Sequence, residues 1–410
     1  MFRKIRLFTP GPTPLVPAGQ FAMAAADLHH RTPEFRALFT RVLTQLKEFI
    51  GTKNDVVVLT SSGTGAMEAA VANLVNPGDK VLVVTAGKFG ERWVSLAKVY
   101  GCKAEVVSAP YGEAPSVEAI RAAITPEIKA VFVQATETST GIRHCVPAIA
   151  KMVQNTDALL VVDAITGLGT TAIDVDGDGI DVTIGGSQKA LMIPAGLAYL
   201  AVSERAWKRM EGCKQPRYYF DLAKERKNAA KGESSYTPSV ALFAALDAAL
   251  GYIAGQGAGS IAEGRKLLVE NAERNAAMTR AAAAAMKLEL FAPTAPSAAV
   301  TAVKAPAGIS SSDIVKQVKA RFGGVMTDGQ GEMKGQIFRI AHIGYLDYMD
   351  TVALVAALEQ VLIELTPGKF ALGDGLRAAQ QCYQDWMTGK AVPQCVCGCA
   401  SAACVAGEKR

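Results

Sequence analysis

Seven short apolar segments divide the first half of the chain, and they restrict the fold more than any other feature. Most are separated by stretches of helical length, such as 64–75, 90–100, 116–123 and 147–155. Strands this apolar are buried on both faces, which is typical of a parallel sheet between layers of helices. The segments are 55–60, 80–84, 104–108, 129–134, 158–163, 181–184 and 197–202. We therefore predict an α/β fold with a mainly parallel, seven-stranded sheet flanked by helices.

The length of the chain predicts more than one domain, because at 410 residues it exceeds the size of a single hydrophobic core. After residue 258 the sequence changes to an alanine-rich helix (261–286), short strands and further helices, which predicts a compact α+β unit. The strands are expected near 287–291, 298–303 and 336–341, and the helices near 311–321 and 347–365. We predict an N-terminal arm (1–20), a large domain (21–258), a small C-terminal domain (259–366) and a flexible, cysteine-rich extension (367–410), in which residues 374–387 could form one more helix.

Composition and charge narrow the class of protein. Hydrophobic residues make up 50% and charged residues 20% of the chain, as in globular proteins with a large core. The formal charge of +5 is small for this length, and no basic stripe stands out, so we expect no nucleic-acid partner. Prolines interrupt the basic N-terminus and no apolar signal-peptide core forms. No uncharged apolar run is long enough to span a bilayer, so we expect a cytoplasmic protein without a membrane partner.

The loops after the carboxyl ends of parallel strands are where reactive groups collect in such sheets. After the first strand, residues 60–68 read TSSGTGAME, and their small residues open a helix with backbone N–H groups and hydroxyls facing one point. This is a natural phosphate site. It is not a GxGxxG motif, because Glu68 stands where the third glycine would be, and it is not a P-loop. An ordinary capped helix explains the same residues equally well.

Three later strand ends carry other candidate groups. Phe89, in the turn GKFG (87–90), could lie flat on a planar ligand, although a core position is the better interpretation of this residue alone. Residues 136–141 (TETSTG) are rich in hydroxyls that can bind a ligand or cap the turn. Asp163 ends a very apolar strand, where a carboxylate needs a positive or donating partner.

Lys189 follows the next strand, in the run GGSQKAL (185–191), among small residues with little charge nearby. Burial makes a lysine amine a usable nucleophile toward a carbonyl cofactor, whereas a loop lysine that reaches solvent is the simpler alternative. The order of the strand-end groups is the stronger signal: phosphate-type turn, aromatic, hydroxyl loop, aspartate and lysine. Pyridoxal 5′-phosphate has a phosphate, a planar ring, a ring nitrogen and an aldehyde, and would use all five groups.

Residues 185–191 are also the most specific part of a family resemblance that covers roughly residues 5–365. The chain resembles the class V, fold-type I aminotransferases of the alanine–glyoxylate and serine–glyoxylate (serine–pyruvate) group. This resemblance implies that Lys189 forms the Schiff base with pyridoxal 5′-phosphate and that Asp163 partners the ring nitrogen. The other implied cofactor contacts are Ser62, Gly63 and Thr64 at the phosphate with Gln188 beside them, Thr138 near the phenolic oxygen, and Phe89 stacked over the ring.

The resemblance also implies contacts to the substrate. Phe338-Arg339-Ile340 matches the motif whose arginine binds the substrate carboxylate, and a guanidinium suits this role because it binds carboxylates bidentately. A surface ion pair is the alternative for Arg339. The proline-rich stretch 9–13 resembles the N-terminal arm of the family, and this match places Gly11 near the substrate.

A homodimer with active sites at the subunit interface is a further implication, because the family is dimeric. Tyr236-Thr237-Pro238 matches a segment that reaches the phosphate of the partner subunit. Some relatives have a tyrosine three positions before this threonine, where the present chain has Ser234.

The expected reaction is a ping-pong transamination from a small L-amino acid, alanine or serine, to a 2-oxo acid such as glyoxylate or pyruvate. Lys189 would move the proton as general base and then acid. Aspartate and aminoethylphosphonate transamination stay open, because the pocket residues that set specificity cannot be placed. A cysteine desulfurase is less favoured, since no cysteine lies between Cys213 and Cys382.

Five cysteines lie in the last thirty residues, outside the resemblance. Cys395, Cys397, Cys399 and Cys404 could bind a soft metal as thiolates. Their spacing is not the paired Cys-x-x-Cys of zinc ribbons and no histidine lies near, so we favour a flexible tail, with a metal or redox role as the alternative. A non-catalytic interaction protein with a metal-binding tail is the alternative from a different class, but it leaves the ordered pairing of Asp163 and Lys189 unexplained.

Overall fold

A seven-stranded sheet forms the centre of the protein in the computed structural model, which describes residues 3–390. The strand order is β2-β10-β9-β8-β5-β3-β4, and only β10 runs antiparallel to its neighbours. The strands are β2 (Asp55–Leu59), β3 (Lys80–Thr85), β4 (Lys103–Ser108), β5 (Ile128–Gln134), β8 (Leu159–Asp163), β9 (Val182–Gly186) and β10 (Ala198–Val202). The predicted fold class is confirmed, and each predicted strand of this sheet is present to within two residues at either end.

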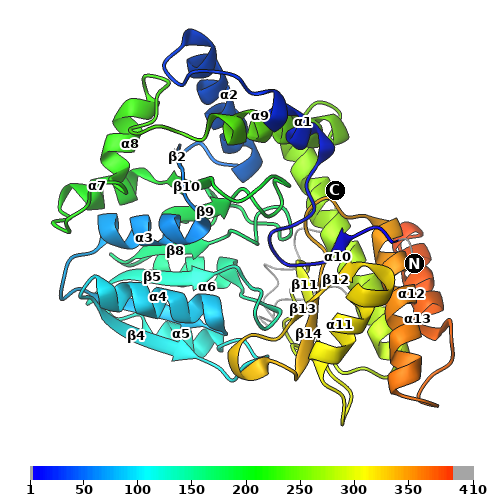
Figure 1. Cartoon of the computed structure of the whole chain (residues 1–410). Coiled ribbons are helices and arrows are strands. Elements are labelled where there is room, and N and C mark those ends of the chain that lie inside the picture. The colour runs from blue at the N-terminus through cyan, green and yellow to red at the C-terminus, as the bar shows by residue number, and fades with distance from the viewer. Residues whose placement is uncertain (1–2, 391–410) are drawn as a thin grey trace.

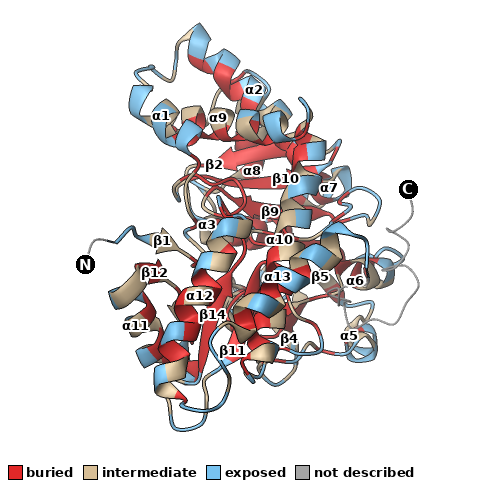
Figure 2. Ribbon diagram, turned by 90° about the vertical axis from the view of Figure 1, so that its right-hand side faces the viewer, coloured by how far each residue is buried: buried red, intermediate tan, exposed pale blue. Residues whose placement is uncertain are grey.

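Helices cover both faces of this sheet (Figure 1). Val56 and Val58 of β2 pack into a core with α2, α6 and α9, whereas Val57 and Leu59 pack into a second core with α3, α4 and α7. Figure 2 shows the strands of the sheet coloured as buried and the helices around them partly exposed. The helices are α1 (Pro17–Ala25), α2 (Pro33–Ile50), α3 (Gly63–Leu74), α4 (Lys88–Val99), α5 (Val117–Ala123), α6 (Val146–Val153), α7 (Glu204–Glu211), α8 (Leu222–Ala229) and α9 (Val240–Gln256).

The second half of the chain builds a smaller sheet with its own core. This three-stranded sheet has the order β11-β14-β13 and is antiparallel, and its core includes Met278, Ile314 and Phe338. The predicted strand 287–291 contributes only an isolated bridge between Leu290 and Val303. The elements are α10 (Ile261–Ala285), β11 (Val300–Lys304), α11 (Ser311–Phe322), β12 (Gly324–Val325), β13 (Thr327–Asp328), η1 (Gly331–Met333), β14 (Ile337–Ala341) and α12 (Tyr348–Leu365).

The chain turns sharply between the two parts. Helices α9 and α10 are bent by 79° at their break, close to the position of the predicted domain boundary. The boundary itself stays a prediction. Within residues 3–390, no single helix is long and apolar enough to cross a membrane, and only the bent pair α9 and α10 together meets that criterion of length and composition.

The helix expected within the extension is present, at the predicted residues. α13 (Asp374–Met387) packs against α10 and α12, and its Cys382 is buried in the smaller core. The apolar face of α13, which includes Leu376, Tyr383 and Trp386, explains this packing. The cysteine run of the tail (395–404) lies outside the described residues.

Candidate active site

Five groups singled out from the sequence follow the carboxyl ends of five strands at the same edge of the sheet. Ser62 follows β2, Phe89 follows β3, Thr138 follows β5, Asp163 ends β8 and Lys189 follows β9. These strands all run in the same direction, so their carboxyl ends share one edge. The structure therefore brings the groups to the edge where α/β proteins bind ligands.

Lys189 is buried at this edge. Its ammonium Nζ donates to the main-chain oxygen of Pro10 at 2.5 Å, and no carboxylate of the described residues lies within ion-pair distance. The pKa of Lys189 is lowered to about 8, mainly by burial. The charge of Asp163 opposes this shift, and the charges of Arg339 and Arg92 add to it. The amine is therefore far more often neutral near pH 7 than that of an exposed lysine.

Asp163 shows the opposite shift for the same reason. Its Oδ1 accepts a hydrogen bond from the backbone N–H of Ile165 at 3.0 Å. The pKa of Asp163 is raised to about 6, mainly by burial and also by the charge of Glu137. The hydrogen bond from Ile165 and the charges of Lys189 and Arg92 oppose this shift. A buried amine and a buried carboxyl that affect one another's ionisation are typical of catalytic sites.

The N-terminal arm joins the smaller sheet to this lysine. Strand β1 (Arg6–Leu7) pairs with β12, and the main chain of Phe8 bonds to Val325 and to Ala341 of β14. Five residues later, the Thr13 hydroxyl donates to the main-chain oxygen of Lys189 at 2.9 Å. The arm is thus held at both ends, so that residues 9–12 pass directly over the lysine.

Gly11 is the point of closest approach, since a Cβ at this position would lie 2.4 Å from Lys189 Nζ. Gly11→Ala should displace the lysine amine and lower the rate at which the protein reacts with an aldehyde cofactor by roughly 10-fold or more. The φ angle of +151° adds strain. Gly78→Ala is the matched control, because Gly78 also has a positive φ of +89° but nothing within 4 Å. Equal reaction rates in the two variants would contradict the prediction.

The phosphate-type turn opens α3. Ser62 is the N-cap residue, but its hydroxyl makes no capping bond, and a Cβ on Gly63 would meet Ile165 at 2.3 Å. The Thr64 hydroxyl accepts a hydrogen bond from Arg92 at 3.0 Å. Gln188 Oε1 is buried and has no hydrogen-bond partner among residues 3–390. Free backbone N–H groups and an unused hydroxyl at a helix N-terminus are suited to an anion.

Glu137 is a site residue that sequence reasoning missed. It is fully buried, and its Oε2 accepts from the backbone N–H groups of Phe89 (2.9 Å) and Gly90 (3.0 Å). Its Oε1 accepts from the hydroxyl and the N–H of Ser139, so it fixes the loop with Thr138 against the start of α4. The sequence pattern that indicated Asp163 also applies to Glu137, because this carboxylate comes shortly after the apolar strand 129–134.

Arg339 lies on β14 and is buried against the same loop. Its Nη1 donates to the main-chain oxygen of Thr138 at 2.9 Å, and its Nε and Nη2 donate to that of Asp328 at 3.2 and 2.6 Å. It forms no ion pair within the described chain, and burial lowers its pKa to about 10. The surface ion pair considered as an alternative is therefore wrong for Arg339, which instead has N–H donors left for an anion.

Thr237 is a predicted cofactor contact that lies apart from the other candidate residues in the single chain. It is exposed, and no hydrogen bond of its side chain within residues 3–390 reaches the other candidate residues. Its neighbour Tyr236 stacks on Tyr219 with ring centres 4.9 Å apart, and the Tyr219 hydroxyl donates to Thr60 at 3.3 Å. The segment therefore lies close to the start of the phosphate-type turn but faces outward.

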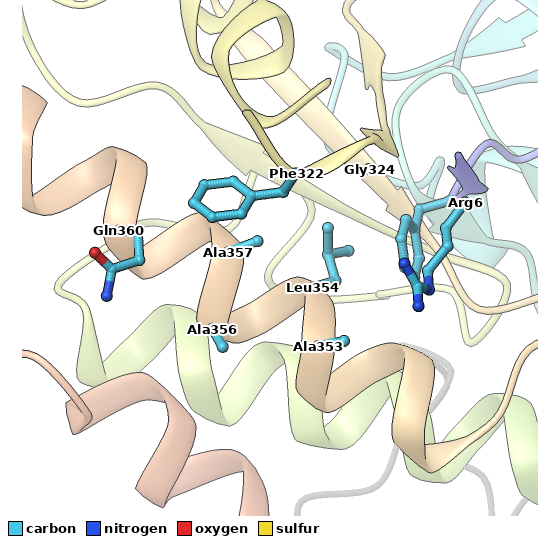
Figure 3. A pocket seen from close by; sticks show the side chains of 9 residues that line it. Arg6, Phe322, Gly324, Ala353, Leu354, Ala356, Ala357 and Gln360 are labelled. Carbon is cyan, nitrogen blue, oxygen red and sulfur yellow. The ribbon is translucent and has the colours of Figure 1, made fainter. Parts of the chain in front are cut away.

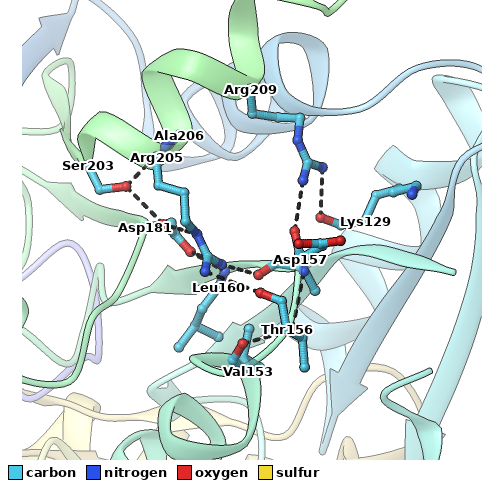
Figure 4. Close-up of polar contacts among 11 residues, drawn as sticks. Lys129, Val153, Thr156, Asp157, Leu160, Asp181, Ser203, Arg205, Ala206 and Arg209 are labelled. Atoms are coloured by element: carbon cyan, nitrogen blue, oxygen red, sulfur yellow. Dashed lines mark hydrogen bonds and ion pairs between the residues drawn. The ribbon is translucent and has the colours of Figure 1, made fainter. Parts of the chain in front are cut away.

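Two hollows of the molecule contain none of the candidate residues. A groove of about 330 Å³ lies between β1, the end of α11 and α12, and its lining is mostly apolar (Figure 3). Another, of about 300 Å³, is lined by Asp176, Asp181 and Arg205. In this second region Arg205 bonds to Asp181 and to main-chain oxygens, which ties α7 to the sheet (Figure 4). The contacts of Arg205 give this second region a structural role.

Comparisons with known proteins show the family of this chain. The family model "Aminotransferase class-V" matches residues 19–332. The chain is 39% identical over 388 residues to the soluble hydrogenase 42 kDa subunit of Anabaena cylindrica, covering 93% of this chain and 99% of the relative. It is 32% identical over 399 residues to a serine–glyoxylate aminotransferase of Methylorubrum extorquens, covering 94% and 97%. An aspartate aminotransferase of subgroup IV from Thermus thermophilus has a similar structure, with a TM-score of 0.81, 33% identity and coverage of 88% and 99%.

The family match covers most of the chain and includes every candidate residue except Gly11 and Arg339. Its members bind pyridoxal 5′-phosphate, the cofactor expected from the order of the strand-end groups. The chain belongs to the class V aminotransferases, and its cofactor is pyridoxal 5′-phosphate.

Proposed function

We propose that the protein transfers an amino group from a small L-amino acid, alanine or serine, to a 2-oxo acid such as glyoxylate or pyruvate. The observation that carries this proposal is the arrangement of Lys189, Asp163 and Arg339 around one sheet edge. The amine can react with a carbonyl, the carboxyl can pair with a ring nitrogen, and the guanidinium is free to bind a carboxylate. Such a set accommodates a cofactor with an amino acid on it.

The residues present fit pyridoxal 5′-phosphate. The buried, unpartnered Gln188 Oε1 and the unused Ser62 hydroxyl provide groups for the phosphate beside Gly63 and Thr64. We assign the phosphate to these four residues. We propose that Phe89 stacks on the cofactor ring. Its backbone is held in place by the hydrogen bond to Glu137. The remaining assignments are Thr138 for the phenolic oxygen, Asp163 for the ring nitrogen and Lys189 for the aldehyde.

Each side chain then has a definite task. The bound cofactor supplies an aldehyde for the amino group and a ring that accepts electrons from the substrate α-carbon. Lys189 would take the proton from the substrate α-carbon as a base and then, as an acid, deliver it to the carbon that carries the cofactor's aldehyde, for which a pKa of about 8 is well suited. Asp163 keeps a proton on the ring nitrogen. Arg339 binds the substrate carboxylate and so orients the α-carbon bond that breaks.

We further propose a homodimer in which Thr237 serves the partner's phosphate site. The exposure of Thr237 in the single chain supports this arrangement, because an outward-facing residue beside the phosphate-type turn can contact a second subunit. The similarity to the serine–glyoxylate aminotransferase of Methylorubrum extorquens also supports glyoxylate as the acceptor. The cytoplasmic location stays a prediction.

Donor specificity can be read from the visible spectrum of the protein loaded with pyridoxal 5′-phosphate. We expect L-alanine or L-serine to bleach the visible band of the bound cofactor and glyoxylate to restore it, because the two half-reactions are separate. L-Aspartate is the decisive comparison, since an aspartate aminotransferase is among the structural relatives. Bleaching by L-aspartate that is faster than by L-alanine and L-serine would contradict the proposed donor while leaving transamination intact.

A further inference from the structure

Arg92 connects two parts of the site that the sequence presents separately. It lies on α4, one helical turn after Phe89, and its guanidinium is 4.8 Å from the centre of the Phe89 ring. Its Nη1 donates to the hydroxyl of Thr64, 28 positions earlier in the chain, at 3.0 Å. One side chain thus contacts both a residue assigned to the phosphate and the residue assigned to the ring.

The charge of Arg92 is not neutralised by the chain. Among residues 3–390 it forms no ion pair, and the bond to Thr64 uses one of its five N–H donors. Its field reaches the catalytic pair, since it lowers the pKa of both Lys189 and Asp163. A half-buried guanidinium with unused donors beside a phosphate-type turn is suited to a doubly charged phosphate.

We propose that Arg92 is a positioning residue for the cofactor: it orients the Thr64 hydroxyl, holds the Phe89 ring in place and adds positive charge at the phosphate. A cation over an aromatic face stabilises the position of the ring. The competing explanation is that Arg92 only ties α3 to α4. The two explanations differ in whether the phosphate group of the ligand matters.

The test compares two ligands that differ only in the phosphate. Apoprotein is titrated with pyridoxal 5′-phosphate and with pyridoxal, and the dissociation constants are measured from the change in protein fluorescence. Arg92→Met should weaken pyridoxal 5′-phosphate binding roughly 10-fold or more, because a hydrogen bond to a charged group is lost. Pyridoxal should lose clearly less affinity. Arg92→Lys should lie in between, since it keeps the charge but not the planar fork.

Two further variants separate positioning from stability. Thr64→Val combined with Arg92→Met should weaken pyridoxal 5′-phosphate binding by less than the product of the single effects, because both act at one contact. Arg321→Met is the matched control: Arg321 also lies over a phenylalanine, Phe322, at 5.2 Å, but it pairs with Glu364 outside the site. Its ligand affinities should not change. If Arg92→Met changes both dissociation constants by the same factor, or neither, Arg92 is only a tie between helices and the proposal is wrong.

Discussion

Replacing Lys189 by alanine should abolish transamination. The variant loses the amine that binds the aldehyde and the base that moves the α-proton, and the second loss alone is expected to cost roughly 10⁴-fold in turnover. No other lysine of the described chain is expected to take its place, because none of them is buried. The fold should persist, since alanine removes an ammonium whose burial carries a desolvation cost.

Turnover with L-serine and glyoxylate measures the effect, and added methylamine tests its cause. If Lys189 acts through its amine, methylamine should restore a measurable part of the activity, whereas it cannot repair a misfolded protein. Lys266→Ala is the control, because Lys266 is exposed and pairs only with Glu263. Turnover of Lys189→Ala at the wild-type rate without added amine would refute the assigned role.

The central sheet could be predicted from the sequence because its strands are apolar on both faces. Val56 and Val57 are neighbours in β2 but pack into different cores on the two faces of the sheet. A strand buried on both faces needs an uninterrupted run of apolar residues, and such a run is easy to recognise in the sequence. The smaller sheet was predicted less completely. Strands β12 and β13 have two residues each, too few for a recognisable period, and 287–291 pairs only through an isolated bridge.

The candidate site could be predicted only where position along a strand was enough. Asp163 and Lys189 follow from the rule that ligands bind at the carboxyl ends of parallel strands. Glu137 follows an apolar strand, as Asp163 does, so it could have been proposed as a buried carboxylate. Its bond to Phe89, 48 positions away, could not be predicted, and neither could the bond of Arg92 to Thr64, 28 positions away. The path of the N-terminal arm over Lys189 could not be predicted either, because the contacting residues Thr13 and Lys189 are 176 positions apart. The resemblance to a family, not the spacing, indicated Gly11 and Arg339.

Replacing Arg339 should remove the preference of the enzyme for amines that carry a carboxylate. Loss of one partner of a buried, hydrogen-bonded charge pair costs several kcal/mol, so Arg339→Gln should lower kcat/KM for L-alanine by roughly 10²–10³-fold. Ethylamine is the matched substrate, because it is L-alanine without the carboxylate. Its slow reaction should change little, so that the ratio of the two kcat/KM values falls toward one.

This ratio separates a substrate contact from a structural role. The Arg339 guanidinium also holds main-chain oxygens of Thr138 and Asp328, so its loss will disturb the loop for any substrate. Arg205→Lys provides the comparison, since Arg205 likewise holds main-chain oxygens but lies outside the site. It should leave the ratio unchanged. A fall in kcat/KM that is equal for L-alanine and ethylamine in Arg339→Gln would mean that Arg339 supports the loop and does not bind the carboxylate. Because the buried guanidinium has no carboxylate partner in the described chain, we expect the substrate to be that partner.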